Sequence, residues 1–457
     1  MTSRDLTSGV RKTGAPVHGA GAGTGAGAGA PTAGGRRRDR GGALRALGPG
    51  ILFAGAAIGG SHLVQSTRAG AGWGFALVWV VVLAMVFKYP FFEFSHRYTA
   101  ATGESLLHGY RRLGLWALAL FTVIVMVSSF ITTAAVTLVT AGLAGALLQL
   151  TWPVEWLSAG VLLVVGAILG LGRYRTLDVV MKAMVAVLAV LTLVAVSVAA
   201  VHGPAGDPQF VRPPLWTGAG IAFLLALMGW MPTPVDVAVW PSLWRLEKER
   251  TTHHHASVRE ALVDFHVGYV TTGVLALAFL SFGALLMFGT GEALSGAGVP
   301  FCNQLVSMYT AALGEWSRWI IALVAFITMF STTLTVCDGY TRTLEGCWAL
   351  LRRRPDELDA PVTAGRRLYG WLLPALMLSG LAVIVFFMSG LTALMDVATI
   401  LAFLTGPFVA ALNVAVMRSR RMPAADRPPR WLRWLAVAGI VYLAGFSVVF
   451  LVLQLRG

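Results

Sequence analysis

Long apolar runs, almost free of charged residues, alternate along the chain with short polar stretches that are rich in arginine. A helix of about 20 apolar residues crosses the ~30 Å hydrocarbon core of a bilayer. The runs lack the strict alternation over about 10 residues that marks the strands of a membrane barrel. The pattern therefore predicts an all-α integral membrane protein with eleven transmembrane helices. The hydrophobic segments cover residues 44–70, 73–97, 114–148, 155–172, 178–201, 215–244, 261–288, 316–348, 367–389, 391–416 and 431–455.

The basic residues between these segments predict an orientation. With the N-terminus in the cytoplasm, 29 Lys and Arg residues fall on the cytoplasmic side and 4 on the opposite side. Short cytoplasmic loops of membrane proteins carry such an excess of Lys and Arg. One helix more or fewer in the middle of the chain would erase the bias. We therefore expect a multi-pass plasma-membrane protein with a cytoplasmic N-terminus and an extracellular C-terminus.

Composition narrows the class of protein. Apolar residues make up 56% of the chain and charged residues 12%, whereas soluble domains carry roughly 25% charged residues. This excludes a soluble enzyme, a disordered chain and a secreted disulfide scaffold. The net charge of +14 would suit nucleic acid, but the basic residues follow the loops, so no nucleic-acid partner is expected. The three cysteines, Cys302, Cys337 and Cys347, are widely spaced and are expected to be buried apolar residues.

Catalytic and nucleotide-binding motifs are missing from the sequence. Neither a Walker sequence nor an HExxH motif occurs. We therefore expect neither an enzyme nor an ATP-driven pump, and no bound cofactor.

Two of the segments carry helix breakers near their middle. Gly59-Gly60-Ser61 interrupts the first segment, and Pro232 and Pro234 interrupt the sixth. Glycine is a poor helix former, and proline removes a backbone donor. Broken backbone at membrane depth is tolerated only where it faces protein or a water-filled cavity. Breaks five segments apart favour an inverted-repeat transporter with its site near the bilayer midplane.

The first 42 residues differ from the rest of the chain. Residues 14–35 are mostly Gly and Ala and lead into the basic run at residues 36–40. Such low-complexity sequence cannot bury a core, which predicts a disordered basic cytoplasmic tail over residues 1–42. Residues 43–455 are expected to form one transmembrane domain. Its parts are a first repeat at about 44–201, a second repeat at about 215–416 and an extra helix at about 431–455.

Several short motifs in segments one, two, six and eight resemble those of one membrane-protein family. They are Gly48-Pro49, Ala69-Gly70-Ala71, Gly74-Phe75 with Trp79, Met231-Pro232, the hydroxyl-rich run Ser331, Thr332, Thr333 and Thr335, and Glu345-Gly346. Together they resemble the Nramp divalent-metal transporters, over about residues 43–455. The resemblance implies a LeuT-type fold, a 5+5 inverted repeat in which helices 1 and 6 are broken. It also implies secondary-active transport of a divalent cation, Mn²⁺, Fe²⁺ or Mg²⁺, by alternating access.

The metal-binding motifs of that family are not intact in this chain. Gly59 stands where the family has a metal-binding Asp, and His62 stands where it has an Asn ligand. Met231 keeps the sulfur ligand, but Thr233 replaces the following His. In the third segment two hydroxyl residues stand in place of the family's acidic pair near its proton path. They are Ser129 and Thr132. The chain thus resembles a divergent branch of the family.

The candidate site gathers at the two breaks. The expected metal ligands are the imidazole of His62, the thioether of Met231, Asp396, and the backbone carbonyl of Ala56, which matches a carbonyl that the family uses. Asp236 and Asp396 lie deep in segments six and ten, where an ionisable group is costly and is by default functional. His62, Asp236 and Asp396 are also the candidates for proton coupling. The full candidate substrate site comprises Ala56, Gly59, Gly60, His62, Met231, Thr233, Asp236 and Asp396.

Other ionisable residues have plainer expected roles. Two acid–arginine pairs have the i,i+4 spacing of helix ion pairs. They are Glu93 with Arg97 and Asp338 with Arg342. Lys88 has two open roles, because it either snorkels to the cytoplasmic interface or neutralises a buried acid. Asp264 and His266, which open segment seven, are expected at the membrane interface.

Two further hypotheses about function stay open. Gly59 and Gly60 leave room and bare backbone at the first break, which suits a small organic solute carried on the same scaffold. A membrane receptor without transport is compatible with the same sequence. The expected partners are a small ion or molecule and the lipid bilayer, and we expect a monomer or weak oligomer.

Overall fold

The computed structural model describes residues 49–171, 174–207, 209–252, 255–359, 366–386 and 390–456. These residues form helices and contain no strand. The α-helices are α2 (Pro49–Ala57), α3 (Thr67–Trp73), α4 (Val78–Thr102), α5 (Leu106–Leu113), α6 (Leu115–Leu148), α7 (Val154–Gly170), α8 (Tyr174–His202), α9 (Gly218–Gly229), α10 (Val239–Thr252), α11 (Val258–Leu286), α12 (Gly298–Leu313), α13 (Arg318–Leu351), α14 (Arg366–Phe386), α15 (Leu391–Met417) and α16 (Arg430–Arg456). Shorter turns are the π-turn η1 (Ser61–Ser66) and the 3₁₀ turns η2 (Gly74–Leu77), η3 (Val235–Ala238), η4 (Glu315–Ser317), η5 (Pro355–Glu357) and η6 (Ala424–Asp426). The tail expected at residues 1–42 lies outside the described residues.

Each hydrophobic segment coincides with one helix or with two half-helices. α2 and α3 share the first segment, and α9 and α10 share the sixth, so both predicted breaks are confirmed. Among the described residues, eight helical stretches are long and apolar enough to cross a membrane, and α7 and α9 are shorter apolar helices. The all-helical membrane fold is therefore confirmed, whereas the count of eleven spans stays a prediction.

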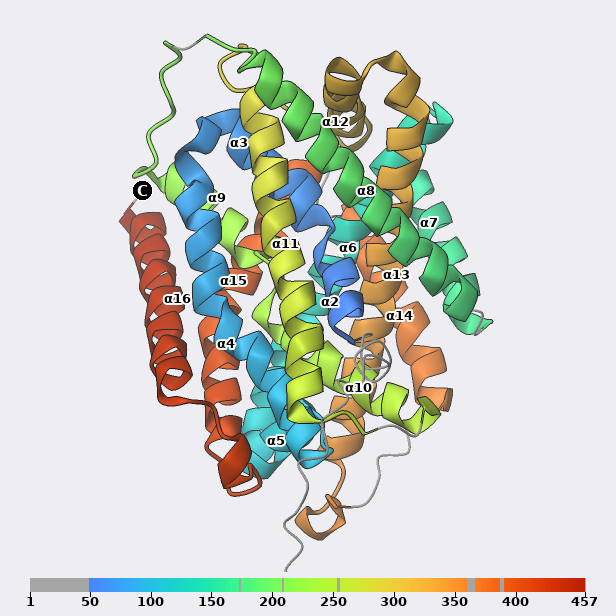
Figure 1. Cartoon of the computed structure of the whole chain (residues 1–457). Helices are drawn as coiled ribbons and strands as arrows, with labels where there is room; N and C mark the ends of the chain where they lie inside the picture. The colour runs from blue at the N-terminus through green and yellow to red at the C-terminus, as the bar shows by residue number, and fades with distance from the viewer. Residues whose placement is uncertain are drawn as a thin grey trace, which may run out of the picture. The chain divides into compact units, whose positions relative to one another are not determined.

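Unbroken helices hold the broken ones in place. α6 and α13, each of 34 residues, pack along each other. α11 packs against both α2 and α3, and α15 packs against α9. α16 lies along α4 and α15 at the edge of the bundle (Figure 1). The two breaks are therefore surrounded by continuous helices on several sides.

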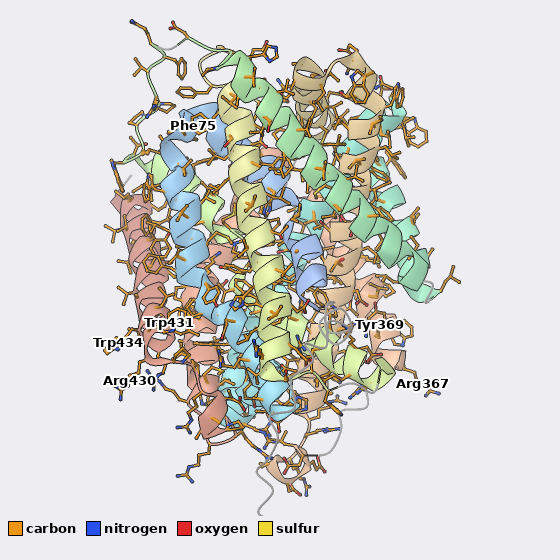
Figure 2. The ribbon with its side chains drawn as sticks, viewed as in Figure 1. Phe75, Arg367, Tyr369, Arg430, Trp431 and Trp434 are labelled. Carbon is orange, nitrogen blue, oxygen red and sulfur yellow. The ribbon has the colours of Figure 1, made fainter. Side chains whose placement is uncertain are left out.

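The outward faces of the helices are apolar, with side chains pointing away from the bundle (Figure 2). Val123 on α6, Val190 on α8, Val270 on α11 and Val441 on α16 are each more than half exposed. Apolar exposure on this scale is rare on soluble monomers. In a bilayer these side chains contact acyl chains instead of water.

Aromatic and basic side chains gather at the starts of two helices. Figure 2 shows Arg430, Trp431 and Trp434 at the start of α16, and Arg367 and Tyr369 at the start of α14. Tryptophan and tyrosine are enriched where a membrane helix meets the headgroups. These residues therefore mark the level at which one membrane surface crosses the bundle.

The half-helix α3 crosses α11 at backbone contact. A Cβ atom on Gly70 would lie 1.9 Å from the carbonyl oxygen of Leu280, and one on Gly283 would lie 2.2 Å from that of Thr67. Small residues let membrane helices approach this closely. The position of α3 therefore depends on a close helix crossing at which residues 70 and 283 must be glycine.

Several local predictions are confirmed. Arg97 Nη2 lies 2.5 Å from Glu93 Oε1, and Arg342 Nε lies 2.8 Å from Asp338 Oδ2. The three cysteines are buried and free. Ion pairs within one helix and the burial of small apolar residues thus follow from spacing and composition.

Candidate functional site

The first break lies between α2 and η1, where the chain leaves the helix at residues 58–60. Neighbouring helices press against it. A Cβ atom on Gly59 would lie 2.8 Å from the side chain of Thr332, and one on Gly60 would lie 2.7 Å from Met395 Cε. Because residues 59 and 60 are glycines, α13 and α15 can pack closely against the break. Side chains of these two helices occupy the room that was expected beside the glycines.

The second break separates α9 from η3 at residues 230–234. Pro232 and Pro234 lie within it, and neither can donate a backbone hydrogen bond. The peptide bond between Met231 and Pro232 is cis. The interruption predicted from the prolines is therefore present at the expected residues.

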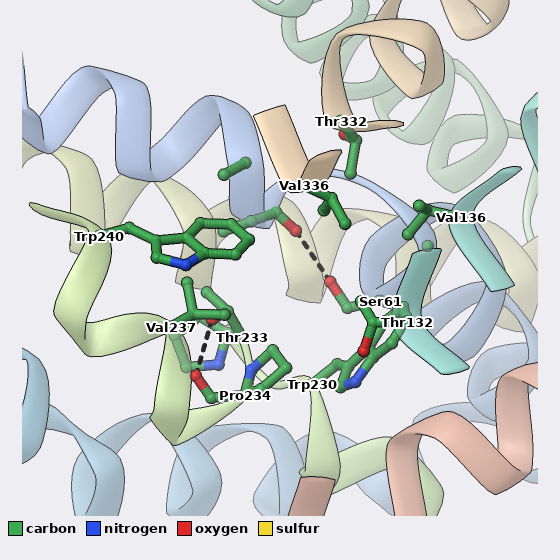
Figure 3. A pocket seen from close by; sticks show the side chains of 14 residues that line it. Ser61, Thr132, Val136, Trp230, Thr233, Pro234, Val237, Trp240, Thr332 and Val336 are labelled. Atoms are coloured by element: carbon green, nitrogen blue, oxygen red, sulfur yellow. Dashed lines mark hydrogen bonds between the residues drawn. The ribbon is translucent and has the colours of Figure 1, made fainter. Parts of the chain in front are cut away.

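A small cavity of about 30 Å³ lies where the two breaks meet (Figure 3). Both broken helices supply walls, and α6 and α13 supply the rest. The lining residues are Ala56, Ala57, Gly60, Ser61, Thr132, Val136, Trp230, Pro232, Thr233, Pro234, Val237, Trp240, Thr332 and Val336. The polar side chains among them are hydroxyls and indoles, and within the described residues this lining has no acid, base or histidine.

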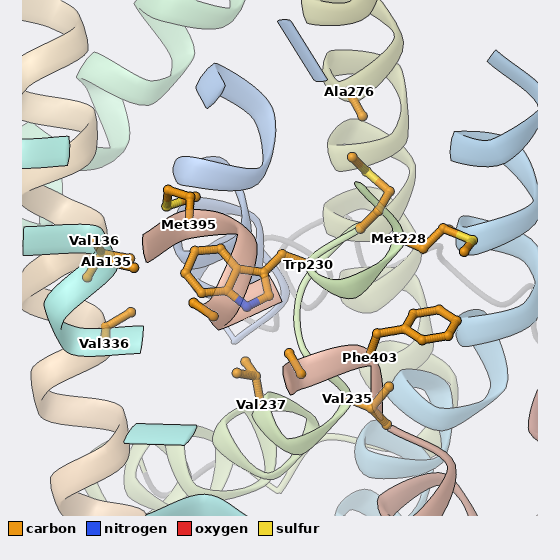
Figure 4. Close-up of a cluster of buried hydrophobic side chains, with 14 of the residues drawn as sticks. Ala135, Val136, Met228, Trp230, Val235, Val237, Ala276, Val336, Met395 and Phe403 are labelled. Atoms are coloured by element: carbon orange, nitrogen blue, oxygen red, sulfur yellow. The ribbon is translucent and has the colours of Figure 1, made fainter. Parts of the chain in front are cut away.

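Two tryptophans of the second broken helix line the cavity. Trp230 is 4% exposed and Trp240 2%, and Figure 4 shows Trp230 set among apolar side chains that include Met395. Within the described part of the chain, neither indole Nε1 has a hydrogen-bond partner. A buried donor without a partner costs about 1–3 kcal/mol. Each indole therefore has an N–H group that pairs with no acceptor among the described residues.

His62 does not line the cavity, because its ring turns toward α11. Its Nδ1 lies 2.7 Å from Ser61 Oγ, and its Nε2 lies 2.9 Å from the carbonyl oxygen of Thr272. Ser61, which does line the cavity, donates its hydroxyl to the carbonyl of Ala57 at 2.9 Å. Both ring nitrogens are therefore engaged, and the tautomer decides whether Nδ1 donates to Ser61 Oγ or accepts from it. His62 offers no free nitrogen to a metal in this conformation.

Asp236 lies in η3 behind the cavity wall and is 2% exposed. The hydroxyl of Tyr340 lies 3.3 Å from Asp236 Oδ2 and 3.4 Å from Thr132 Oγ1. Thr132 lines the cavity. One tyrosine hydroxyl therefore stands between the carboxylate and the cavity.

Asp396 lies outside the cavity lining and is held by Arg68 of α3. The two Arg68 Nη atoms donate to the two carboxylate oxygens, Nη1 to Oδ1 at 2.6 Å and Nη2 to Oδ2 at 3.1 Å. Gln65 donates to Asp396 Oδ1 at 2.9 Å and accepts from Arg68 Nη1 at 2.9 Å. The Arg68 guanidinium also lies 5.3 Å from the ring centre of Phe223 on α9. This group, which we call the α3 closure, joins the first broken helix to α15 and α9.

Asp264, which was expected at the membrane interface, is buried within the bundle. It is 1% exposed, and its Oδ2 accepts the backbone N–H of Gly50 at 2.7 Å. Arg245 of α10, itself 3% exposed, places Nη2 3.7 Å from the same oxygen. A carboxylate is favourable at a helix N-terminus, where backbone N–H groups lack partners. We call this group the α2 closure, because it ties the start of α2 to α10 and α11.

Lys88 does not snorkel. Its side chain is fully buried, and Nζ donates to the carbonyl oxygens of Met228 and Gly229 at 2.6 and 2.7 Å. The expectation that it reaches the cytoplasmic interface is wrong, because the ammonium is held at the carbonyl end of α9.

The sequence was compared with known protein families. Residues 50–453 match the profile of the family described as Nramp, natural resistance-associated macrophage protein-like. This chain belongs to the Nramp family. Nramp proteins are secondary-active transporters of divalent metals and not enzymes. The resemblance drawn from the short motifs is therefore confirmed, and this Nramp chain is a multi-pass membrane protein.

The relatives of this Nramp chain include one curated sequence and several solved structures. It is 38% identical over 416 residues to the uncharacterized protein PM0681 of Pasteurella multocida (strain Pm70). These aligned residues cover 90% of this chain and 92% of that protein. A mutant of the Eremococcus coleocola manganese transporter matches with a TM-score of 0.66 at 14% identity, over 90% of this chain and 86% of that one. MhsT in complex with L-phenylalanine matches with a TM-score of 0.53 at 12% identity, over 89% of this chain and 97% of that one. MHP1, a nucleobase-cation-symport-1 family transporter, matches with a TM-score of 0.53 at 16% sequence identity. The match covers 90% of this chain and 91% of that one. These structures show a shared LeuT-type fold.

The structure brings together only part of the predicted Nramp site. Three of its residues, Ala56, Gly60 and Thr233, line the cavity. The other five do not, and they are Gly59, His62, Met231, Asp236 and Asp396. Among the described residues, no group of three or more His, Cys, Asp or Glu side chains is placed to hold a metal.

Met231 and the carbonyl of Gly59 do not face the cavity as free ligands in this conformation. Met231 is fully buried in the apolar core and does not line the cavity. The carbonyl of Gly59, at the first break, accepts the N–H groups of His62 and Leu63 at 3.0 Å each. The side-chain oxygens that line the cavity are hydroxyls, and of these only that of Thr233 belongs to the predicted site, whereas those of Ser61, Thr132 and Thr332 do not. Ser61 and Thr332 could have been chosen, because one lies in the first break and the other in a run of hydroxyl residues.

Proposed function

We propose that this Nramp chain carries a divalent cation, Mn²⁺, Fe²⁺ or Mg²⁺, through the cavity between its two broken helices. The observation that carries the proposal is the cavity itself, which opens where both breaks meet in a member of a divalent-metal transporter family. Four hydroxyls line it, from Ser61, Thr132, Thr233 and Thr332. Hard cations prefer oxygen ligands, and Mg²⁺ usually keeps several waters. With no carboxylate in the lining, we expect weak binding of a partly hydrated ion.

The two closures support alternating access. The α3 closure holds Arg68 to Asp396, and the α2 closure holds Gly50 to Asp264. Each ties one short half-helix of the first broken helix to an unbroken helix and to one half of the second broken helix. Opening one while the other stays formed would expose the cavity to one side at a time. In this proposal Asp396 belongs to a closure and does not coordinate the substrate.

His62 is the proposed proton-coupling residue. Its hydrogen bonds reach Ser61 at the cavity and Thr272 on α11, so a change in the protonation of the ring would alter a contact at the cavity and one on α11. Asp236, linked to the cavity by Tyr340, is the second candidate. Replacement of His62 by Gln keeps one donor and one acceptor but removes the titration, so metal-driven proton flux should fall while metal flux persists.

The predicted orientation completes the proposal. The bias of 29 basic residues to 4 supports a cytoplasmic N-terminus, an extracellular C-terminus and a plasma-membrane location. The α2 closure would then lie on the cytoplasmic side and the α3 closure on the extracellular side. The substrate is a small ion and the surrounding medium is the lipid bilayer; we propose a monomer or weak oligomer.

Filling the cavity is expected to stop transport. In proteoliposomes the wild type should take up Mn²⁺ with saturation, and Thr132→Trp, which projects an indole into the cavity, should reduce uptake at least tenfold. The matched control is Thr271→Trp on the exposed face of α11, which should leave uptake unchanged. Absence of flux for Mn²⁺, Fe²⁺ and Mg²⁺ in the wild type, with the protein folded, would contradict the proposal.

Charge reversal tests the α3 closure. Arg68→Asp or Asp396→Arg alone removes a bidentate pair that is partly exposed, at 18% and 31%. The closed state is expected to lose about 1 kcal/mol, which lowers the ratio of closed to open molecules about fivefold. The double reversal should recover most of the uptake rate lost in each single variant. Additive losses in the double variant would argue against a closing role for the pair.

One observation favours a second candidate, a small organic solute. The cavity walls contain two indole donors that have no partner among the described residues, and the lining has no carboxylate. An uncharged solute with hydrogen-bond acceptors would satisfy both. A thermal-shift screen of metabolites against divalent chlorides separates the two candidates, since only one class should raise the melting temperature of the wild type and fail to raise that of Thr132→Trp.

A further inference from the structure

A buried lysine sits at the end of the first half of the second broken helix. Lys88 lies in the middle of α4 and has no exposed surface. Its Nζ donates to the carbonyl oxygens of Met228 at 2.6 Å, Gly229 at 2.7 Å and Thr233 at 3.3 Å. An ammonium has three donors, and here each has a backbone carbonyl.

These carbonyls lack their usual helical partners because of the break. The residue four positions after Met228 is Pro232, which has no N–H to donate. Met228 accepts only a longer bond from the N–H of Met231, at 3.3 Å, besides that of the residue capping α9. The end of a helix also carries the negative pole of its dipole. The break therefore creates a small region of concentrated negative potential inside the membrane.

Close packing keeps this region away from solvent and lipid. A Cβ atom on Gly229 would lie 1.8 Å from the carbonyl oxygen of Thr399, so α9 ends in backbone contact with α15. Asp236, in the turn that follows the break, is 2% exposed and acts electrostatically on Lys88. Three carbonyl oxygens with a carboxylate nearby form the kind of donor set that binds a hard cation. Unwound backbone and half-helix ends of transporters coordinate coupling ions in this way.

We propose that Lys88 is a built-in cation that permanently fills a monovalent-ion site at the carbonyl end of α9. The ammonium supplies the positive charge that an exchangeable Na⁺ or K⁺ would otherwise bring. Because it is covalently tethered, this position cannot load and unload with the ion gradient. The wild type is therefore expected to need no monovalent metal ion at the second break, whichever substrate it carries.

Removing the ammonium should recreate the vacant ion site. Lys88→Ala leaves the three carbonyls around an empty space, with the carboxylate of Asp236 close enough to act on it electrostatically. We expect the melting temperature of purified Lys88→Ala to be well below that of the wild type in choline chloride. It should rise by several degrees in NaCl or KCl of equal ionic strength, and further with ion concentration, because an ion that binds only the folded state stabilises it. The wild type should melt at the same temperature in all three salts.

Lys88→Gln separates the charge from the hydrogen bonds. Glutamine offers two N–H donors and no charge, and it fills most of the space, so it should melt below the wild type and respond alike to every salt. If the melting temperature of Lys88→Gln equals that of the wild type, the charge is unnecessary and the proposal is overturned. It is also overturned if folded Lys88→Ala shows no selective response to Na⁺, K⁺ or Li⁺, or if the wild type responds as strongly. Should Lys88→Ala not fold in any salt, the Lys88→Gln result decides. None of these readouts uses the transported substrate, so they stand apart from the flux assays.

Discussion

Asp264→Ala is expected to lower the free energy of unfolding by about 3–5 kcal/mol, because it leaves the buried Arg245 guanidinium without its carboxylate. The same change removes the acceptor for the N–H of Gly50 at the start of α2. Loss of a helix cap adds about 0.5–2 kcal/mol. Unfolding of the purified protein in mixed micelles, followed by circular dichroism, measures the sum.

Asp264→Asn separates the two contributions. The amide oxygen can still accept from Gly50, whereas the charge beside Arg245 is gone, so most of the loss should remain. Glu315→Ala is the matched control, since Glu315 forms an exposed pair with Arg318, and its melting temperature should equal that of the wild type. An Asp264→Ala protein as stable as the control would show that the α2 closure does not hold the helix.

Gly283→Ala and Gly70→Ala form the second large test. Each methyl group would meet a backbone carbonyl at about 2 Å, at 2.2 and 1.9 Å respectively, and a backbone atom cannot rotate away. Overpacking of this kind costs about 1–3 kcal/mol or more. Alanine gains about 1 kcal/mol over glycine in a helix, which is too little to compensate. Both variants should melt below the wild type and lose transport, because α3 carries Arg68.

Gly72→Ala provides the control on the same half-helix. No atom lies within 4 Å of a Cβ placed at Gly72, so only the gain in helix propensity applies, and this variant should melt at or slightly above the wild type. The order of the three melting temperatures is the result to check. If Gly283→Ala matched Gly72→Ala, the crossing of α3 and α11 would be looser than the structure shows.

The sequence predicted features that depend on neighbours along the chain. The glycines at 59 and 60 and the prolines at 232 and 234 placed both breaks correctly, because they act through the local backbone. The i,i+4 pairs Glu93–Arg97 and Asp338–Arg342 followed from helix geometry alone. The family landmarks gave the fold for the same reason, since they are short local motifs.

Contacts between distant segments were not predictable. Asp264 meets Gly50 across 214 positions, Arg68 meets Asp396 across 328, and Lys88 meets Met228 across 140. No local pattern pairs them. Snorkelling to the interface was one of the two roles left open for Lys88, because a lysine in an apolar helix usually extends to water. Three carbonyls within reach changed that outcome.

His62 illustrates a different limit, that of helix phase. It follows the first break within η1, a π-turn. A π-turn departs from the 3.6-residue period, so a position that appears to face the site by counting residues can face elsewhere. The ring turned toward α11 and bonded Thr272. The face of a side chain just after a break cannot be counted from the helix before it.

The acid-free lining of the cavity has a consequence for the driving force. In the proposed transport no carboxylate of the lining compensates the divalent ion, so the loaded cavity would carry two uncompensated positive charges. Each elementary charge that crosses the membrane gains about 2.3 kcal/mol per 100 mV of membrane potential. Two charges gain about 4.6 kcal/mol, on the order of a thousandfold in accumulation. An interior-negative voltage alone would then concentrate the metal, and transport should appear as an inward current even where no proton gradient exists.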